Sequence, residues 1–227
     1  MHPLDNVIWK ALTTLQSHLA LRNERAGKFL PDFSLLGASV DQTDHGYESL
    51  ASLMKPGERV GLFLEEIPVV PSPWRMIASG PMLEMVYTGS SVAKDGHQVP
   101  EFLRLGEADI GEMLALTELT KPGPFAKRTH EMGEYWGIRQ KGMLVAMAGE
   151  RLRLPGYTEV SAVCTHPDHL GCGHATALIS MLRQRILERG EQPFLHVRAD
   201  NARAVGLYER LGFEKRVMLQ YVRLERK

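Results

Sequence analysis

Cysteine is scarce in this chain, which has only Cys164 and Cys172 among 227 residues. Two thiols cannot build the disulfide framework that stabilises small secreted domains, and they fit a reducing compartment. No apolar stretch approaches the about 20 residues of a membrane span, and the N-terminus lacks the charged start and apolar run of a signal peptide. The sequence therefore predicts a cytoplasmic protein with no membrane partner.

The chain also lacks net charge, because 27 lysines and arginines balance 27 aspartates and glutamates. Proteins that bind nucleic acid usually carry a basic surface, so we expect no nucleic-acid partner. Hydrophobic residues make up 44% of the sequence, which is enough to bury a substantial core. The length fits one large domain or two small ones, and it leaves a homodimer open.

A polar stretch with glycine and proline breakers, residues 90–100, separates two regions of stronger pattern. We therefore predict an accessory α/β domain over residues 1–97 and a second domain over residues 98–227. The first region has helical periodicity over 5–20 and 47–54, and strand-like runs over 59–64 and 74–87. The two regions show no clear sequence repeat. An alternative is that the first region is a degenerate half-copy of the fold of the second region.

The second region alternates strand and helix patterns, which places it in the α/β (α+β) class. Three consecutive strands in its middle predict an antiparallel meander, so the sheet should be mixed and mostly antiparallel, with helices on its faces. The predicted strands span 101–105, 135–139, 143–154, 157–165 and 194–197, and the predicted helices span 109–119, 171–188 and 201–211.

A glycine turn, Gly171-Cys172-Gly173-His174-Ala175, follows the strand over 157–165 and opens a long amphipathic helix. Backbone N–H groups at a helix start lack partners and attract anions such as a pyrophosphate. A dinucleotide-binding fingerprint, and with it an oxidoreductase, is the competing interpretation. It requires a third glycine where this chain has Thr176.

Two blocks of this region together resemble the acetyl-coenzyme A binding core of the GNAT superfamily of N-acyltransferases. The first is Leu170 to Ala175, where Gly173 and Ala175 match the pyrophosphate signature but Leu170 replaces the usual arginine or glutamine. The second block consists of Asn201, Ala204, Leu207-Tyr208 and Gly212-Phe213. The resemblance covers roughly residues 101–227. It implies the GNAT fold for that region.

Three further segments resemble the C-terminal domains of glycine N-acyltransferases, a branch of the same superfamily. They are Pro122-Gly123-Pro124-Phe125, Met147-Ala148-Gly149-Glu150 and Pro193-Phe194-Leu195-His196. The loop over 121–128 is where such folds commonly hold the acceptor. Its Lys121, Lys127 and Arg128 either bind a carboxylate-bearing acceptor or form a solvated charge run.

The resemblance implies an N-acetyltransferase that moves an acetyl group from acetyl-coenzyme A, without a metal, to a primary amine of a small molecule, amino acid or peptide. A noncatalytic acyl-coenzyme A binding module is the alternative, and turnover separates the two. Asn201 either contacts the pantetheine arm or caps its helix. The expected cofactor-binding residues are Val163, Cys164, Thr165, Leu170, Gly171, Cys172, Gly173, His174, Ala175, Asn201, Ala204 and Tyr208.

Tyr208 is the predicted general acid, because a phenol with a pKa of ~10 is protonated at neutral pH and can donate to the departing thiolate. An amine acceptor must lose a proton before it attacks, and a carboxylate is the simplest base. Glu159 stands where several GNAT members carry a catalytic glutamate, and Glu150 on the preceding strand is its rival. Alternatively, either glutamate is a solvent-exposed charge at the end of a strand, without a catalytic role.

Four potential zinc ligands, Cys164, His166, His169 and Cys172, lie within nine residues of one another. The cysteines fall in a strand and in the glycine turn, and the histidines lack the paired spacing of a zinc finger. We therefore predict no metal site. His166, His169 and His174 either lend positive charge to phosphates or are solvated loop residues.

Overall fold

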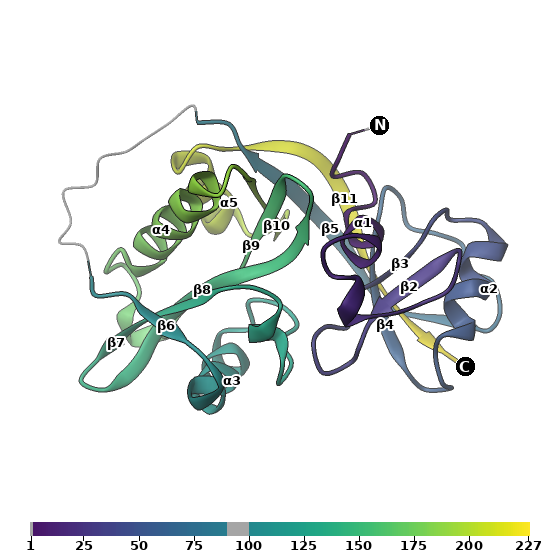
Figure 1. The fold of residues 1–227 in the computed structure, drawn as a ribbon, viewed down its shortest axis with the longest axis horizontal. Helices are drawn as coiled ribbons and strands as arrows, with labels where there is room; N and C mark the ends of the chain where they lie inside the picture. Colours follow the sequence, from purple (N-terminus) through teal and green to yellow (C-terminus); the bar gives the residue numbers. More distant parts are fainter. Residues whose placement is uncertain (1, 90–99) are drawn as a thin grey trace.

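The computed structural model describes residues 2–89 and 100–227, and an eight-stranded sheet dominates this part of the chain (Figure 1). Neighbouring strands are antiparallel except β9 and β10, which are parallel. The expectation of a mixed, mostly antiparallel sheet is thereby confirmed. In spatial order the strands are β4 (Arg59–Leu64), β11 (Phe213–Arg226), β5 (Trp74–Tyr87), β10 (Gln192–Arg198), β9 (Tyr157–Thr165), β8 (Met143–Leu154), β7 (Tyr135–Gln140) and β6 (Leu103–Leu105).

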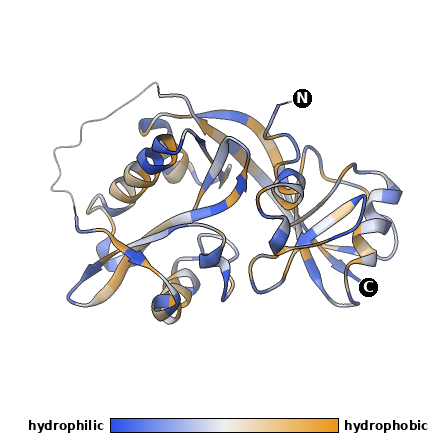
Figure 2. Ribbon diagram, in the orientation of Figure 1, coloured by the Kyte–Doolittle hydropathy of each residue, from blue (hydrophilic) through white to orange (hydrophobic). Residues whose placement is uncertain are grey.

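Helices cover both faces of this sheet, with α4 (His174–Glu188) and α5 (Ala202–Arg210) on one face and α3 (Ile110–Thr120) on the other (Figure 1). The apolar stripe of α4 buries Leu178 and Leu182 in one core with strand residues, while Met113 of α3 packs in another core. Figure 2 shows α4 with both hydrophobic and hydrophilic stretches, as an amphipathic helix requires. The part of the sheet around β7, β8 and β9 is therefore a buried layer between helices.

The N-terminal residues pack directly on the sheet. Helix α1 (Val7–Thr13) shares one hydrophobic core with Leu152 of β8 and Phe194 of β10. The sequence predicted a longer helix, over 5–20, but the hydroxyl of Thr14 donates to the carbonyl of Lys10 and the helix ends there. The other elements before β4 are η1 (Ser17–Leu19), the small sheet of β1 (Ala20–Arg22), β2 (Ala26–Phe29) and β3 (Gly37–Ser39), and α2 (Asp44–Ser52).

The predicted division near residue 97 falls at a stretch, residues 90–99, that lies outside the described residues. Strand β5 comes before this stretch, yet it pairs with β10 on one side and with β11 on the other. Strand β4 pairs with β11 in the same sheet. The sheet therefore draws strands from both predicted domains. A unit of residues 98–227 alone would lack the strand that joins β10 to β11.

Strand β11 had no counterpart among the predicted elements. Its sequence carries many charged residues, and two register shifts against β5, near Arg216 and Arg223, break the alternation that a strand normally shows. The other predicted strands of the main sheet appear within a few residues of their expected bounds. None of the helices in the described residues is long and apolar enough to cross a membrane.

Candidate functional site

Strands β9 and β10 part from each other along the sheet, and this opening defines the site. Their parallel pairing ends at Glu159 and Phe194, after which β10 stays paired with β5 and β9 stays paired with β8. An extra residue in β9 shifts its register against β8, and Ala162 there has a positive φ of 52°. Such a bulge turns backbone groups away from the ladder. The edge of β9 is consequently open toward β10 over residues 160–165.

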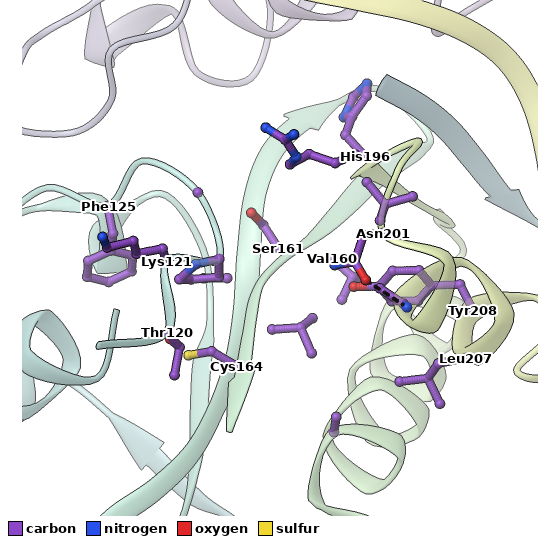
Figure 3. Close-up of a pocket in the computed structure, with 18 of the residues that line it drawn as sticks. Thr120, Lys121, Phe125, Val160, Ser161, Cys164, His196, Asn201, Leu207 and Tyr208 are labelled. Atoms are coloured by element: carbon purple, nitrogen blue, oxygen red, sulfur yellow. Dashed lines mark hydrogen bonds between the residues drawn. The ribbon is translucent and has the colours of Figure 1, made fainter. Parts of the chain in front are cut away.

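A cavity of about 970 Å³ occupies this opening. In Figure 3, Lys121 and Phe125 of the loop after α3 lie on one side, Leu207 and Tyr208 of α5 lie on the other, and Ser161 of β9 stands between them. Residues of β5, β10 and β11 also line the cavity. The cavity thus extends between the two strands, from the N-termini of α4 and α5 to the loop that follows α3.

The glycine turn forms one end of the cavity. Gly171 and Gly173 have positive φ angles of 82° and 77°, which favour glycine, and both line the cavity. Gly173 is the N-cap of α4, and no side chain caps the helix there. The first-turn N–H groups and the helix dipole are therefore available to an anion. Leu170 also lines the cavity, 49% exposed, with no side-chain group that could donate to a phosphate.

Two arginines near the start of α5 also line the cavity, although one of them, Arg198, forms an ion pair with Asp200. Arg198 at the end of β10 and Arg203 of α5 line the cavity beside Asn201. Neither arginine was among the predicted site residues, although both lie in the sequence close to Asn201 and Ala204 of the second motif block. The side chain of Asn201 accepts a hydrogen bond from the N–H of Ala204 at 3.1 Å, so it caps α5.

The other predicted cofactor residues differ in accessibility. Val163, Cys164 and Thr165 line the cavity along β9, and burial raises the pKa of the Cys164 thiol to about 11. Cys172 is exposed and does not line it. Nε2 of His174 lies 3.1 Å from the side-chain nitrogen of Gln140, and burial lowers its pKa. His174 is therefore poorly suited to carry charge for a phosphate.

Tyr208 lines the cavity from α5, where its ring packs edge-on against Phe213 with centroids 6.1 Å apart. Its side chain is largely buried, and this burial raises its pKa to about 12. The phenol is accordingly protonated at neutral pH. Its position and its protonation state suit proton donation into the opening.

Glu159 is buried beneath the cavity and does not line it. It accepts two hydrogen bonds from Arg151, at 2.8 and 2.6 Å, and its Oε1 lies 2.7 Å from Nδ1 of His196. Burial alone would raise the pKa of Glu159, but the two cationic neighbours outweigh it and hold the pKa at about 2. This carboxylate is held by ion pairs and is a poor proton acceptor at neutral pH.

Glu150, the rival base, is also buried and outside the cavity. Its Oε1 accepts from the guanidinium of Arg189 at 2.7 Å, on the residue that caps the C-terminus of α4. The structure therefore brings neither glutamate to Tyr208. Within the described residues, no group of three or more histidine, cysteine, aspartate or glutamate side chains could hold a metal ion.

Known protein families and structures resemble this chain over part or all of its length. The model of the FR47-like protein family matches residues 135–224. The crystal structure of a Novosphingobium aromaticivorans protein assigned to the GNAT family of acetyltransferases is 36% identical over 100% of both chains, with a TM-score of 0.91. This chain belongs to the GNAT family. The expectation of a GNAT fold is thereby confirmed.

Other relatives have either a lower sequence identity over most of the chain or a high identity over a short segment. A GCN5-related N-acetyltransferase from Kribbella flavida is 16% identical over 97% of this chain and 93% of its own, with a TM-score of 0.64, and so shares the fold. Acetyltransferases of Yersinia pestis and Pectobacterium atrosepticum are 44% and 47% identical over 50 and 51 residues. These matches span 22% of this chain and 36% of the curated relatives.

Proposed function

We propose that this GNAT protein is a cytoplasmic N-acetyltransferase that uses acetyl-coenzyme A to acetylate a primary amine of a small molecule, amino acid or peptide. The observation that carries the proposal is the cavity between β9 and β10, which joins the glycine turn to Tyr208. Kinship with glycine N-acyltransferases is a narrower part of the proposal, based on the three segments that resemble that branch.

The cavity fits coenzyme A in shape and in charge. The diphosphate would accept hydrogen bonds from the turn at Gly171 and Gly173, next to the positive end of the α4 dipole. The pantetheine arm would lie along the open edge of β9 over residues 163–165 and hydrogen-bond to it as an added strand does. The thioester would then lie near the bulge at Ala162.

In the proposed reaction, the neutral amine attacks the thioester carbonyl and forms the new C–N bond directly. A backbone N–H near Val163 stabilises the oxyanion, since the bulge frees donors from the strand ladder. When the C–S bond breaks, the thiolate takes the proton of the Tyr208 hydroxyl. After the attack the new amide nitrogen must lose one proton, and the Tyr208 phenolate must regain one. Because neither glutamate lines the cavity, we assign both transfers to water, which accepts the proton from the nitrogen and returns one to Tyr208, so the products are the amide and the free thiol of coenzyme A. We assign Glu159 to holding Arg151 and His196 in place.

A binding and turnover experiment tests this proposal. Calorimetry measures acetyl-coenzyme A binding, and a free-thiol assay measures turnover with amines, amino acids including glycine, and peptides. Binding with thiol release supports an N-acetyltransferase. Binding without thiol release for every acceptor indicates the noncatalytic module, and a failure to bind acetyl-coenzyme A contradicts both.

Replacement of Gly173 by alanine is expected to weaken acetyl-coenzyme A binding by about tenfold or more, because a Cβ at positive φ strains the turn that presents the N–H donors. Gly156→Ala is the matched control, since Gly156 has a φ of 78° but lies in the β8–β9 turn, away from the cavity. Calorimetry should give full affinity for Gly156→Ala. Equal affinities of the two variants would contradict the proposed role of the turn.

A further inference from the structure

The charged side chains that line the cavity in the described residues are all basic. Among the described residues that line it there is no aspartate or glutamate, whereas arginines line it both near α5 and on the opposite side. Arg198 and Arg203 lie beside the proposed cofactor-binding elements, and Arg151 and Arg223 lie on β8 and β11. A second cation on the acceptor, as in a diamine or a lysine-rich peptide, would find no compensating carboxylate here.

Two tyrosine hydroxyls on the same side as Arg151 lack hydrogen-bond partners. Tyr135 is 1% exposed and Tyr221 is partly buried, and the oxygen of each is buried without a partner in the structure described. Both residues line the cavity. A buried hydroxyl without a partner costs free energy, so each is expected to gain one when a ligand binds.

Glycines on the neighbouring strands make room for both tyrosine rings. A Cβ at Gly149 of β8 would collide with the ring of Tyr135, and a Cβ at Gly61 of β4 would collide with the ring of Tyr221. The ring of Phe125 packs edge-on against Tyr135 at 5.6 Å between centroids. The tyrosines are thus held by close packing, as a preorganised binding site requires.

Arg151 lies near both tyrosines and presents a free donor. Its Nε and Nη2 donate to Glu159, and none of the described residues accepts from its Nη1. Burial raises the pKa of both tyrosines, so their hydroxyls are neutral donors, and the nearby charge of Arg151 only partly opposes that rise. The ring of Phe63, from β4, lies 5.9 Å from the guanidinium carbon and helps to fix it. The side chain is 11% exposed and lines the cavity.

We propose that Arg151, Tyr135 and Tyr221 bind a carboxylate on the acceptor, so that the acceptor is an amine that also carries a carboxylate, such as an α-amino acid. This rests on the proposed acetyltransfer to an amine. Three donors around a carboxylate match its acceptor oxygens, and charged hydrogen bonds from arginine are among the strongest in proteins. The carboxylate would orient the amine toward the thioester near Ala162.

The loop after α3 contributes less to this recognition than its sequence suggests. Arg128 donates two hydrogen bonds of 2.7 Å to Glu131 and its guanidinium lies over the ring of Phe33, and Lys127 does not line the cavity. Lys121 does line it. We therefore assign carboxylate binding to side chains of β7, β8 and β11 and not to Lys127 and Arg128 of this loop.

The test compares α-amino acids with their matched amides, which keep the side chain and the amine but lack the carboxylate. Rates of thiol release at saturating acetyl-coenzyme A are divided by the fraction of free amine at the assay pH, and a diamine is included. The wild-type protein is expected to prefer the acid over its amide by at least about tenfold in kcat/KM. Equal use of acid and amide, or a preference for the diamine, would overturn the proposal.

Conservative variants identify the residues. Tyr135→Phe and Tyr221→Phe are each expected to lower the acid-to-amide ratio by about tenfold through KM, because one hydrogen bond to a charged group is lost. Tyr47→Phe is the control, since its hydroxyl is also buried without a partner among the described residues but does not line the cavity. An unchanged ratio in both cavity variants would overturn the assignment. Arg151→Met is avoided because it would leave Glu159 with one partner fewer.

A binding measurement keeps this proposal separate from the proposed function. If no amine is acetylated, the acetyltransferase proposal fails, and calorimetry with coenzyme A present then compares N-acetyl amino acids with their amides. Preferential binding of the acids, lost in Tyr135→Phe and Tyr221→Phe but kept in Tyr47→Phe, supports the carboxylate site without turnover. Equal binding of acids and amides overturns it.

Discussion

Replacement of Tyr208 by phenylalanine is expected to lower kcat by roughly 10²–10⁴-fold, the usual range for a lost general acid. The ring stays in place against Phe213, so acetyl-coenzyme A should bind with nearly unchanged affinity. The hydroxyl matters because the departing thiolate needs a proton, and burial keeps the pKa of Tyr208 at about 12, which leaves the phenol protonated throughout the neutral range. Steady-state kinetics and calorimetry on the same preparation measure both quantities.

Tyr87 provides a matched control for this variant. Its ring belongs to the same hydrophobic cluster, with its centroid 5.7 Å from that of Phe213, but it does not line the cavity. Tyr87→Phe should keep kcat within about threefold of the parent, since it removes a phenol that no step of the reaction uses. If Tyr208→Phe is as active as Tyr87→Phe, proton donation by Tyr208 is excluded.

The features that local sequence could reveal are those that depend on neighbours in the chain. The turn at Gly171 and Gly173 needs positive φ angles, and the amphipathic period of α4 follows at once, so both were predictable from the sequence. The antiparallel meander of β7, β8 and β9 was predictable for the same reason, because short turns join its strands.

The domain division failed to match the sheet because strand order is a long-range property. Residues 90–100 look like a linker, yet β5 before them lies between β10 and β11, which come more than a hundred residues later. No local pattern in β5 indicates its partners. Strand β11 was not predicted because its sequence is charged and its register against β5 shifts twice. Without β11, nothing in the sequence indicated that β5 has a partner on each side.

The residues of the proposed carboxylate site were missed in the sequence for a related reason. Tyr135, Arg151 and Tyr221 come from three strands and line one cavity only after the sheet has formed. Glu159 was predicted as a base from its position in β9, but its sequence neighbours do not reveal the ion pairs with Arg151 and His196. Gly149 lies opposite Tyr135 in the register of β7 and β8, and a Cβ at Gly61 would collide with the ring of Tyr221, so both glycines become informative only once the strand pairing is known.

These ion pairs extend into a chain of alternating charges through the sheet. His196 lies between Glu159 and Glu84, and Glu84 in turn pairs with Arg216. The side chains of Glu84, Glu159 and His196 are at most 1% exposed. A buried charge is stable only when it is paired, so the loss of one member leaves its neighbours uncompensated.

Glu159→Gln is therefore expected to lower the free energy of unfolding by about 3–5 kcal/mol at pH 7, because Arg151 and His196 lose their shared carboxylate. Urea unfolding measures this loss. Asp200→Asn is the control, since the ion pair of Asp200 with Arg198 is exposed and should contribute little. A Glu159→Gln variant as stable as Asp200→Asn would contradict a structural role for the buried carboxylate.

The pH dependence of the same two proteins gives an independent check. The folded state holds the pKa of Glu159 at about 2, below the ordinary value of 4.5, so its contribution is complete above about pH 5 and is lost as the pH falls toward 2. That shift alone corresponds to about 3 kcal/mol. The stability difference between the wild type and Glu159→Gln should therefore shrink on acidification. A difference that stays constant from pH 7 to pH 3 would mean that Glu159 is not held ionised by its buried partners.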